Sequence, residues 1–315
     1  MIFGTFIPQG WKMELAGIPD DQDKWAATMH VARLADELGY DSIWVYDHVH
    51  NVPVPANEAV FECWTTLAAV SQVTERVRLG QMVSCAPYRN PALTAKITAT
   101  LDVISGGRLD FGVGAGWYQQ EFEAYGYDYP DNRDRLQSLK EAVEITKLMW
   151  TEPEATYDGR IHSVRGAQCD PKPLQKLPPI WIGGGGERVT LRIVARHADR
   201  SNFGGKLDEW AHKCEVLKAH CAEVGRDYDE IVKTWSPSLL VRESESDLPT
   251  ESMGAWGEPY DSWVEGNLIG TPEQVVEKLE AYQRLGLGGV VPWIADLPDT
   301  ETLELFATQV MPQFR

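Results

Sequence analysis

Apolar and polar positions follow two alternating patterns along the 315 residues. Short apolar runs of four to seven residues are typical of buried strands, and each is followed by a longer segment whose apolar residues recur at helical spacing. Eight such pairs follow one another. The strands are expected at 2–7, 42–46, 77–83, 109–113, 179–182, 200–203, 231–236 and 290–294, and the helices at 24–38, 61–74, 91–104, 135–150, 188–198, 208–224, 272–285 and 300–311.

The segment from 77 to 117 contains the clearest of these units. Asn90 precedes Pro91, which is the preferred order at a helix start, and Gly106-Gly107 ends the same helix. The next strand runs into Ala115-Gly116-Trp117, where two small residues leave the backbone open to a flat ligand. We therefore expect two neighbouring strand ends to form part of a binding surface.

Eight strand and helix pairs predict an α/β fold, a (β/α)8 TIM barrel with parallel strands inside and helices outside. A barrel of this kind takes roughly 250 residues, so one domain spanning 1–315 accounts for the chain. Two segments, near 151–177 and 242–271, are rich in polar residues, glycine and proline and show no clear period. They are predicted to be insertions on the surface.

Composition excludes several classes of function. The chain has 29 basic and 47 acidic residues, a net charge of −18, and such a surface repels nucleic acid. The apolar runs are too short for a membrane span and the first residues carry no signal-peptide pattern, so a cytoplasmic location is expected. The five cysteines are odd in number and form no Cys-x-x-Cys pair, which argues against a disulfide framework or a structural zinc site.

A run of four glycines marks the end of the fifth strand. Gly183, Gly184, Gly185 and Gly186 are followed by Glu187, directly before a helix. Free backbone amides and the positive end of a helix attract a phosphate at such a position, and active sites of TIM barrels lie on this face. An anion site is the favoured interpretation, and a flexible turn is the alternative.

Asp47 and His48 follow the second strand, where polar side chains must face the mouth of the barrel. A histidine there can exchange a proton with a substrate, and a neighbouring carboxylate can orient it. The alternative is a histidine that only caps the loop. His48 and His50 could also be two metal ligands of a metal-dependent hydrolase. Among the other strand ends only Asp296 offers a further ligand, so no metal site is predicted.

Two further residues could belong to the site. Glu121 lies in the first turn of the helix after the fourth strand, where an acid either interacts favourably with the positive end of the helix dipole or takes part in catalysis. Trp11, in the loop after the first strand, could form a wall of the substrate pocket because an indole covers a planar ligand well.

The chain resembles the luciferase-like monooxygenase superfamily, and most closely its branch of oxidoreductases that use the deazaflavin coenzyme F420. The resemblance rests on separate segments that occur in the expected order over most of the chain. They are YDHV at 46–49, PYRNPALTAKITATLDVISGGRLDFGVGAGW at 87–117, PPIWIGGGGERVTLRIVARHAD at 178–199 and GTPEQVVEKLEAYQRLG at 270–286.

This resemblance assigns roles to several residues. It implies that the glycine run with Glu187 holds the coenzyme phosphate, that Asp47 binds the coenzyme and that His48 is a proton donor or stabilises an anion. It also implies a non-prolyl cis peptide after the third strand, which we place at Ser84-Cys85, with Cys85 packing against the ring rather than acting as a nucleophile. The remaining cofactor contacts are expected at Ala115, Gly116 and Trp117.

The expected activity is hydride transfer between C5 of F420 and a small organic substrate, with His48 and Glu121 as the catalytic residues. An FMN-dependent two-component monooxygenase of the same fold is the alternative, followed by a non-catalytic flavin-binding protein. A phosphosugar substrate is not expected, because Lys206 is nearly alone among acids. Resemblance also implies a homodimer formed through the outer helices near the second and third strands.

Overall fold

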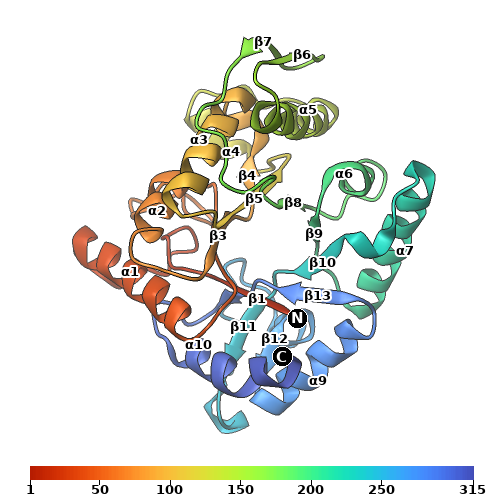
Figure 1. Cartoon of the computed structure of the whole chain (residues 1–315). Helices are drawn as coiled ribbons and strands as arrows, with labels where there is room; N and C mark the ends of the chain where they lie inside the picture. The colour runs from red at the N-terminus through yellow and green to blue at the C-terminus, as the bar shows by residue number, and fades with distance from the viewer.

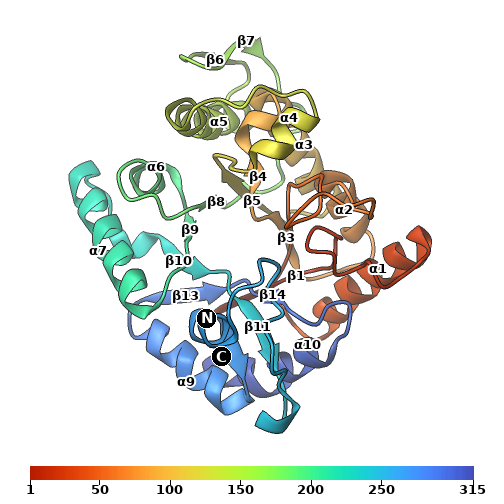
Figure 2. The same cartoon turned by 180° about the vertical axis from the view of Figure 1, so that it is seen from behind.

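The computed structural model describes residues 1–315, and its centre is a closed barrel of parallel strands surrounded by helices (Figures 1 and 2). The predicted TIM barrel is confirmed. Pairing of Leu79 with Leu109 joins β3 to β5 and closes the ring, and pairing of Ile2 with Gly289 joins the first strand to the last. The eight strands of the barrel are β1 Ile2–Phe6, β2 Ser42–Val45, β3 Arg78–Gln81 continued by β4 Ser84–Cys85, β5 Leu109–Gly114, β8 Ile180–Gly183, β9 Arg200–Asn202, β10 Val232–Trp235 and β13 Leu287–Val290.

The helices begin and end largely where the sequence signals them. The side chain of Asn90 accepts a hydrogen bond from the amide of Ala92 at the start of α3, and Gly106 and Gly107 leave that helix with positive φ angles of 69° and 85°. The helices are α1 Asp21–Glu37, α2 Cys63–Val70, α3 Pro91–Ile104, α4 Gln119–Ala124, α5 Asn132–Thr151, α6 Thr190–His197, α7 Leu207–Val224, α8 Tyr260–Gly266, α9 Pro272–Gln283 and α10 Glu301–Leu305.

Two indoles fill the inside of the barrel. The rings of Trp44 and Trp181 meet edge to face at 4.4 Å, and both side chains are fully buried. The neighbouring strand has a glycine where the Trp44 ring lies against it, because a Cβ atom at Gly80 would overlap this ring. The interior is thus a packed core, which leaves the ends of the strands as the place for a ligand.

Two of the differences from the prediction concern the eighth strand and the helix expected from 188. The expected eighth strand is split, because only β13 belongs to the barrel, while β14 Trp293–Ile294 pairs with β11 Ser238–Val241 in a second sheet that also contains β12 Leu268–Gly270. The helix expected from 188 begins at Thr190, since a turn precedes it.

The two predicted insertions contain regular structure that their sequence pattern does not show. Segment 151–177 includes the antiparallel hairpin of β6 Ala155–Asp158 and β7 Ser163–Ala167. Segment 242–271, predicted as a surface insertion without a clear period, contains α8 and β12. Its apolar residues Trp263 and Ile269 pack with Leu240 in a small cluster of their own, so they do not produce the period of a core helix.

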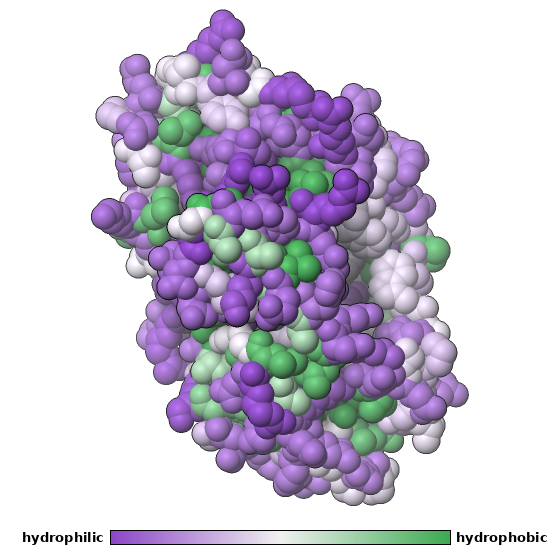
Figure 3. Space-filling view, turned by 90° about the vertical axis from the view of Figure 1, so that its right-hand side faces the viewer, coloured by the Kyte–Doolittle hydropathy of each residue, from purple (hydrophilic) through white to green (hydrophobic).

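None of the helices combines the length and the apolar composition that crossing a membrane requires. On the face shown in Figure 3, hydrophilic side chains predominate and apolar ones form small separate patches.

Candidate active site

A pocket lies where the strand ends of the barrel meet. Residues after β1, β2, the β3–β4 link and β5 contribute to it, so it is on the face that the sequence predicts. It contains six of the predicted site residues. The lining residues are Trp11, Tyr46, Asp47, His48, Met82, Val83, Cys85, Tyr88, Gly116, Trp117 and Tyr118.

His48 is hydrogen-bonded to a buried carboxylate, but this is the carboxylate of Glu121 and not of its neighbour Asp47. The distance from His48 Nδ1 to Glu121 Oε2 is 2.6 Å, and the Glu121 side chain has no exposed surface. A carboxylate accepts the Nδ1 proton, so the arrangement fixes the tautomer of the ring. Nε2 of His48 has no protein partner and remains available to a ligand in the pocket.

Glu121 is held in place by three further donors. Its Oε1 accepts hydrogen bonds from the amides of Val49 and His50, both at 2.9 Å, and its Oε2 also accepts one from the hydroxyl of Tyr88 at 2.9 Å. Burial raises the pKa of this carboxyl, but its hydrogen bond to His48, the charge of His48 and the two amides outweigh burial, so the pKa lies below its ordinary value. Glu121 is therefore ionised at neutral pH.

Aromatic rings surround the imidazole. Trp11 stacks on His48 with ring centroids 4.3 Å apart and planes within 4° of parallel. The rings of Trp117 and Tyr118 meet the imidazole edge to face at 5.8 and 6.1 Å. These contacts exclude water from one side of His48 and strengthen its interaction with the carboxylate. Trp11 thus lines the pocket and lies directly against the histidine.

Both carboxylate oxygens of Asp47 accept hydrogen bonds from other groups of the protein. Arg89 holds Oδ2 at 2.6 Å and Oδ1 at 2.9 Å, and the amide of Cys85 donates to Oδ2 at 2.8 Å. Ser84 lies at the edge of hydrogen-bonding distance, with its hydroxyl 3.4 Å from Oδ2. The buried carboxylate therefore connects β2 to the end of β4 and fixes the backbone on which the pocket is built.

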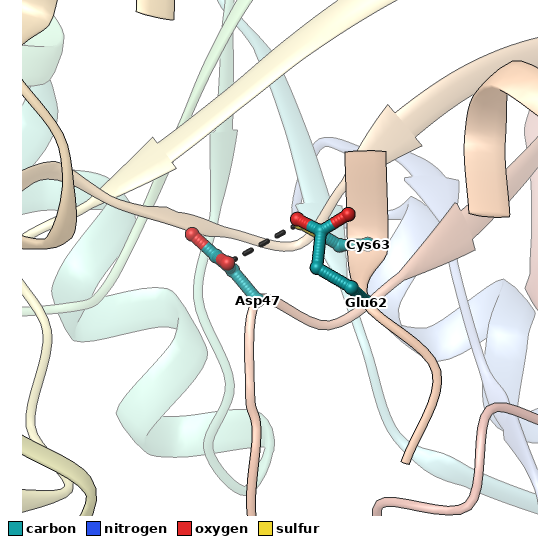
Figure 4. Close-up of side chains that lie close together, drawn as sticks. All are labelled: Asp47, Glu62 and Cys63. Carbon is teal, nitrogen blue, oxygen red and sulfur yellow. Dashed lines mark hydrogen bonds between the residues drawn. The ribbon is translucent and has the colours of Figure 1, made fainter. Parts of the chain in front are cut away.

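Asp47 also lies beside Glu62 and Cys63, as Figure 4 shows, and the Cys63 thiol is 3.2 Å from Asp47 Oδ1. Oxygen and sulfur atoms this close could in principle hold a metal ion. Here the guanidinium of Arg89 already bridges the two carboxylates, since it also donates to Glu62 at 3.1 Å. The cluster is thus satisfied by a cation that the chain supplies, and we assign it no metal.

The histidine and acid considered for a metal-dependent hydrolase belong to different networks. The ring of His50 packs against Tyr125 at 5.4 Å. Asp296 accepts hydrogen bonds from Arg242 at 2.9 Å and from Thr302 at 2.7 Å. The structure does not bring them together with His48 as a ligand set.

The non-prolyl cis peptide is present, but its predicted position at Ser84-Cys85 is wrong. It joins Met82 to Val83, in the break between β3 and β4. The side chain of Val83 enters the space beside two strand ends, where a Cβ at Gly183 would lie 2.6 Å from its Cγ1 and one at Gly114 would overlap its Cγ2. Gly183 is therefore small because of Val83, which no local sequence signal reveals.

Only the second half of the glycine run is open to an anion. The amide of Gly184 donates to the carbonyl of Asn202 at 2.8 Å, whereas the amides of Gly185 and Gly186 have no protein acceptor. The hydroxyl of Thr190 faces the same turn, 2.8 Å from where a Cβ of Gly186 would be. Glu187 turns its carboxylate away, toward His212 at 3.2 Å.

The loop after β5 has the same open character. The amides of Ala115 and Gly116 also lack a protein acceptor, and both residues are only partly buried. Gly116 has a φ of 75°, and a Cβ there would lie 2.6 Å from the sulfur of Cys85. The structure thus brings this loop against Cys85, which is buried, with a pKa raised by burial and by the charge of Asp47, and is not a nucleophile.

Sequence reasoning missed four residues of the site: Lys12, Tyr88, Arg89 and Thr190. The ammonium of Lys12 lies 4.6 Å from the ring centroid of Trp293 and 5.8 Å from that of Tyr46. Tyr88 and Arg89 were visible in PYRNP directly after a strand end, but their carboxylate partners come from distant segments. Only the fold pairs them.

Comparison with known proteins places the chain in a family. The family model described as luciferase-like monooxygenase matches residues 1–262, and the protein belongs to this family. Among individual relatives, the F420-dependent glucose-6-phosphate dehydrogenase of Intrasporangium calvum is 28% identical over 320 residues, covering 91% of this chain and 93% of that protein.

Two solved structures share the fold. An F420-dependent secondary alcohol dehydrogenase in complex with an F420-acetone adduct has a TM-score of 0.84 at 20% identity and covers 100% of this chain and 99% of that one. The oxygenating constituent of 3,6-diketocamphane monooxygenase from Pseudomonas putida, in complex with FMN, has a TM-score of 0.80 at 18% identity, with 99% and 98% covered.

Proposed function

We propose that the protein is an F420-dependent oxidoreductase that passes a hydride between C5 of the deazaflavin and a small organic substrate. The observation that carries the proposal is the pair of His48 and Glu121, set in an aromatic pocket next to strand ends with free backbone amides. The name of the relative that matches over nearly its whole length supports the choice of F420.

The residues present fit such a cofactor. Unpaired amides at Gly185 and Gly186, together with the Thr190 hydroxyl, would hold a phosphate at the start of α6. Val83, Gly116 and Trp117 would lie against the ring system, where small residues and an indole leave room for a flat group. Bound F420 would supply a carbon centre that gives or accepts two electrons as hydride.

The chain itself supplies the proton chemistry. We assign to Nε2 of His48 the transfer of a proton, taken from a substrate hydroxyl during oxidation or returned to the oxygen during reduction. Glu121 acts through His48 as a positioning residue, because its ionised carboxylate fixes the Nδ1 proton and stabilises the imidazolium. Asp47 positions the pocket backbone, with its oxygens already occupied by Arg89.

A small alcohol or ketone fits the pocket better than a sugar phosphate. Lys206, the cation singled out in the sequence, is exposed and pairs with Glu265 at 2.6 Å. Lys12 is the cation that lies over the aromatic rings near the pocket, and one ammonium is a weak phosphate site compared with a cluster of cations. Association into a homodimer stays a prediction.

A titration with two cofactors tests the proposal. F420 should quench the tryptophan fluorescence of the protein at micromolar concentration, and FMN should bind at least tenfold more weakly. Tight binding of FMN without F420 would replace the proposal by the monooxygenase alternative, and binding of neither would favour a non-catalytic protein.

Turnover with a panel of small alcohols, with glucose 6-phosphate as a comparison, tests the reaction. His48→Ala should lower kcat by roughly 10²–10⁴-fold, the contribution of general acid–base catalysis, while cofactor affinity changes little. An unchanged kcat in this variant would remove His48 from the mechanism, and turnover of glucose 6-phosphate in preference to alcohols would overturn the substrate class.

A further inference from the structure

A basic cleft lies between α5 and α6, outside the pocket described above. Its volume is about 490 Å³ and eleven residues line it, five of them cations and none a carboxylate. This is unexpected in a chain with 47 acidic and 29 basic residues. The cations of the cleft are Arg133, Lys140, Arg188, Arg192 and Arg196.

The four arginines of this basic cleft have no partner in the protein. None of them forms an ion pair or a side-chain hydrogen bond, and each is exposed. Lys140 has only a weak pair with Glu144 at 3.8 Å, and Glu144 is itself engaged by the hydroxyl of Tyr157 at 2.6 Å. Uncompensated positive charge is therefore concentrated in one place on an acidic protein.

The placement of the cations on the two helices directs them into the cleft. Arg192 and Arg196 are four residues apart on α6 and so lie on one side of it. Arg188 lies in the turn directly before this helix and also lines the cleft. Arg133 and Lys140 are seven residues apart on α5, again on one side. Like charges at this spacing destabilise a helix slightly, by about 0.2–0.5 kcal/mol per pair, unless an anion compensates them.

The basic cleft is continuous with the glycine turn. A neighbouring hollow is lined by Gly185, Gly186 and Thr190, and it shares Asn132, Leu136, Arg188 and Val189 with the cleft. In Figures 1 and 2, α6 follows β8 on the side of the barrel where α5 packs. An anionic ligand whose phosphate is held by the turn would thus reach the arginines with its next negative groups.

We propose that the basic cleft binds the glutamate carboxylates that follow the phosphate in the tail of F420. This rests on the proposed function. Arginine suits the ligand because its planar guanidinium pairs with a carboxylate through two parallel hydrogen bonds. FMN ends at its phosphate and could not occupy the cleft, so the cleft selects the tailed deazaflavin. Further, the selection is made on the outside of the barrel, away from the reacting atoms.

The test compares three ligands by fluorescence titration of the whole protein: F420 with several glutamates, the form that ends at the phospholactyl group, and FMN. The wild type should bind the tailed form about 10–100-fold more tightly than the tailless form, and the difference should shrink as salt is raised. Arg192→Gln combined with Arg196→Gln should reduce the difference to less than threefold and leave the tailless affinity unchanged.

A matched double variant, Arg165→Gln with Lys218→Gln, removes the same charge at exposed positions outside the cleft and should behave as the wild type. Arg133→Gln, on the opposite wall, should weaken the tailed form alone. Equal affinities of the tailed and tailless forms in the wild type would overturn this inference while the proposed function stands. Failure of both deazaflavin forms to bind would overturn the proposed function and the inference with it.

Discussion

The hydrogen-bonded pair of Glu121 and His48 allows a prediction whose size follows from the structure. In Glu121→Gln the shape is kept and the charge is lost. The amide oxygen can still accept the amides of Val49 and His50, but the NH2 group then faces His48 Nδ1 and the Tyr88 hydroxyl, which donate to the carboxylate in the wild type. His48 must then accept at Nδ1 and carry its proton on Nε2.

Two consequences are expected. The variant loses two hydrogen bonds to a charged acceptor, each contributing ~1.5–3 kcal/mol, and the amide NH2 group regains one hydrogen bond. The free energy of unfolding should therefore fall by about 2–4 kcal/mol. The wrong tautomer should lower kcat by roughly 10²–10⁴-fold, because Nε2 can no longer take up a proton.

Urea unfolding measures the first effect, and single-turnover hydride transfer at saturating substrate measures the second. Tyr88→Phe is the matched control: it removes one hydrogen bond to the same Oε2 and keeps the carboxylate, so it should cost stability but leave kcat within about threefold. The reasoning is refuted if Glu121→Gln turns over at the wild-type rate, or if Tyr88→Phe loses as much activity as Glu121→Gln.

Three other outcomes are expected. Gly183→Ala should destabilise the fold by about 1–3 kcal/mol in urea titrations, since its Cβ would lie 2.6 Å from a methyl of Val83. Adding Val83→Ala should remove this clash, so the double variant should lose less stability than the sum of the two single variants. Additive losses would contradict the explanation. Asp47→Asn should cost about 3 kcal/mol, the low end for breaking a buried pair, because it removes the buried one of the two carboxylates that contact Arg89 and leaves only Glu62. A change below 1 kcal/mol would disprove the role of the pair. Burial lowers the pKa of Lys12 from 10.5 to about 8, against the charges of Glu14 and Glu258. Between these two pH values the unfolded chain binds more protons than the folded one, so the free energy of unfolding should rise with pH there. Lys12→Met should weaken that rise between about pH 8 and 10.5.

The sequence alone determined the architecture and the region of the site. Strand and helix periods, the cap at Asn90 and the glycine stops are local signals, and they sufficed because each depends on neighbours in the chain. The strand-end positions of His48, Trp11 and the glycine turn also followed, since parallel strands in a barrel end on one face.

Which side chains act together was decided only by the tertiary structure. Glu121 meets His48 from 73 residues away, and Arg89 meets Asp47 from 42 residues away, so no spacing rule connects them. The choice of Glu121 over adjacent Asp47 as the partner of His48 depends on the direction in which each side chain leaves its element. That direction is set by packing across the barrel, and a one-dimensional pattern does not contain it.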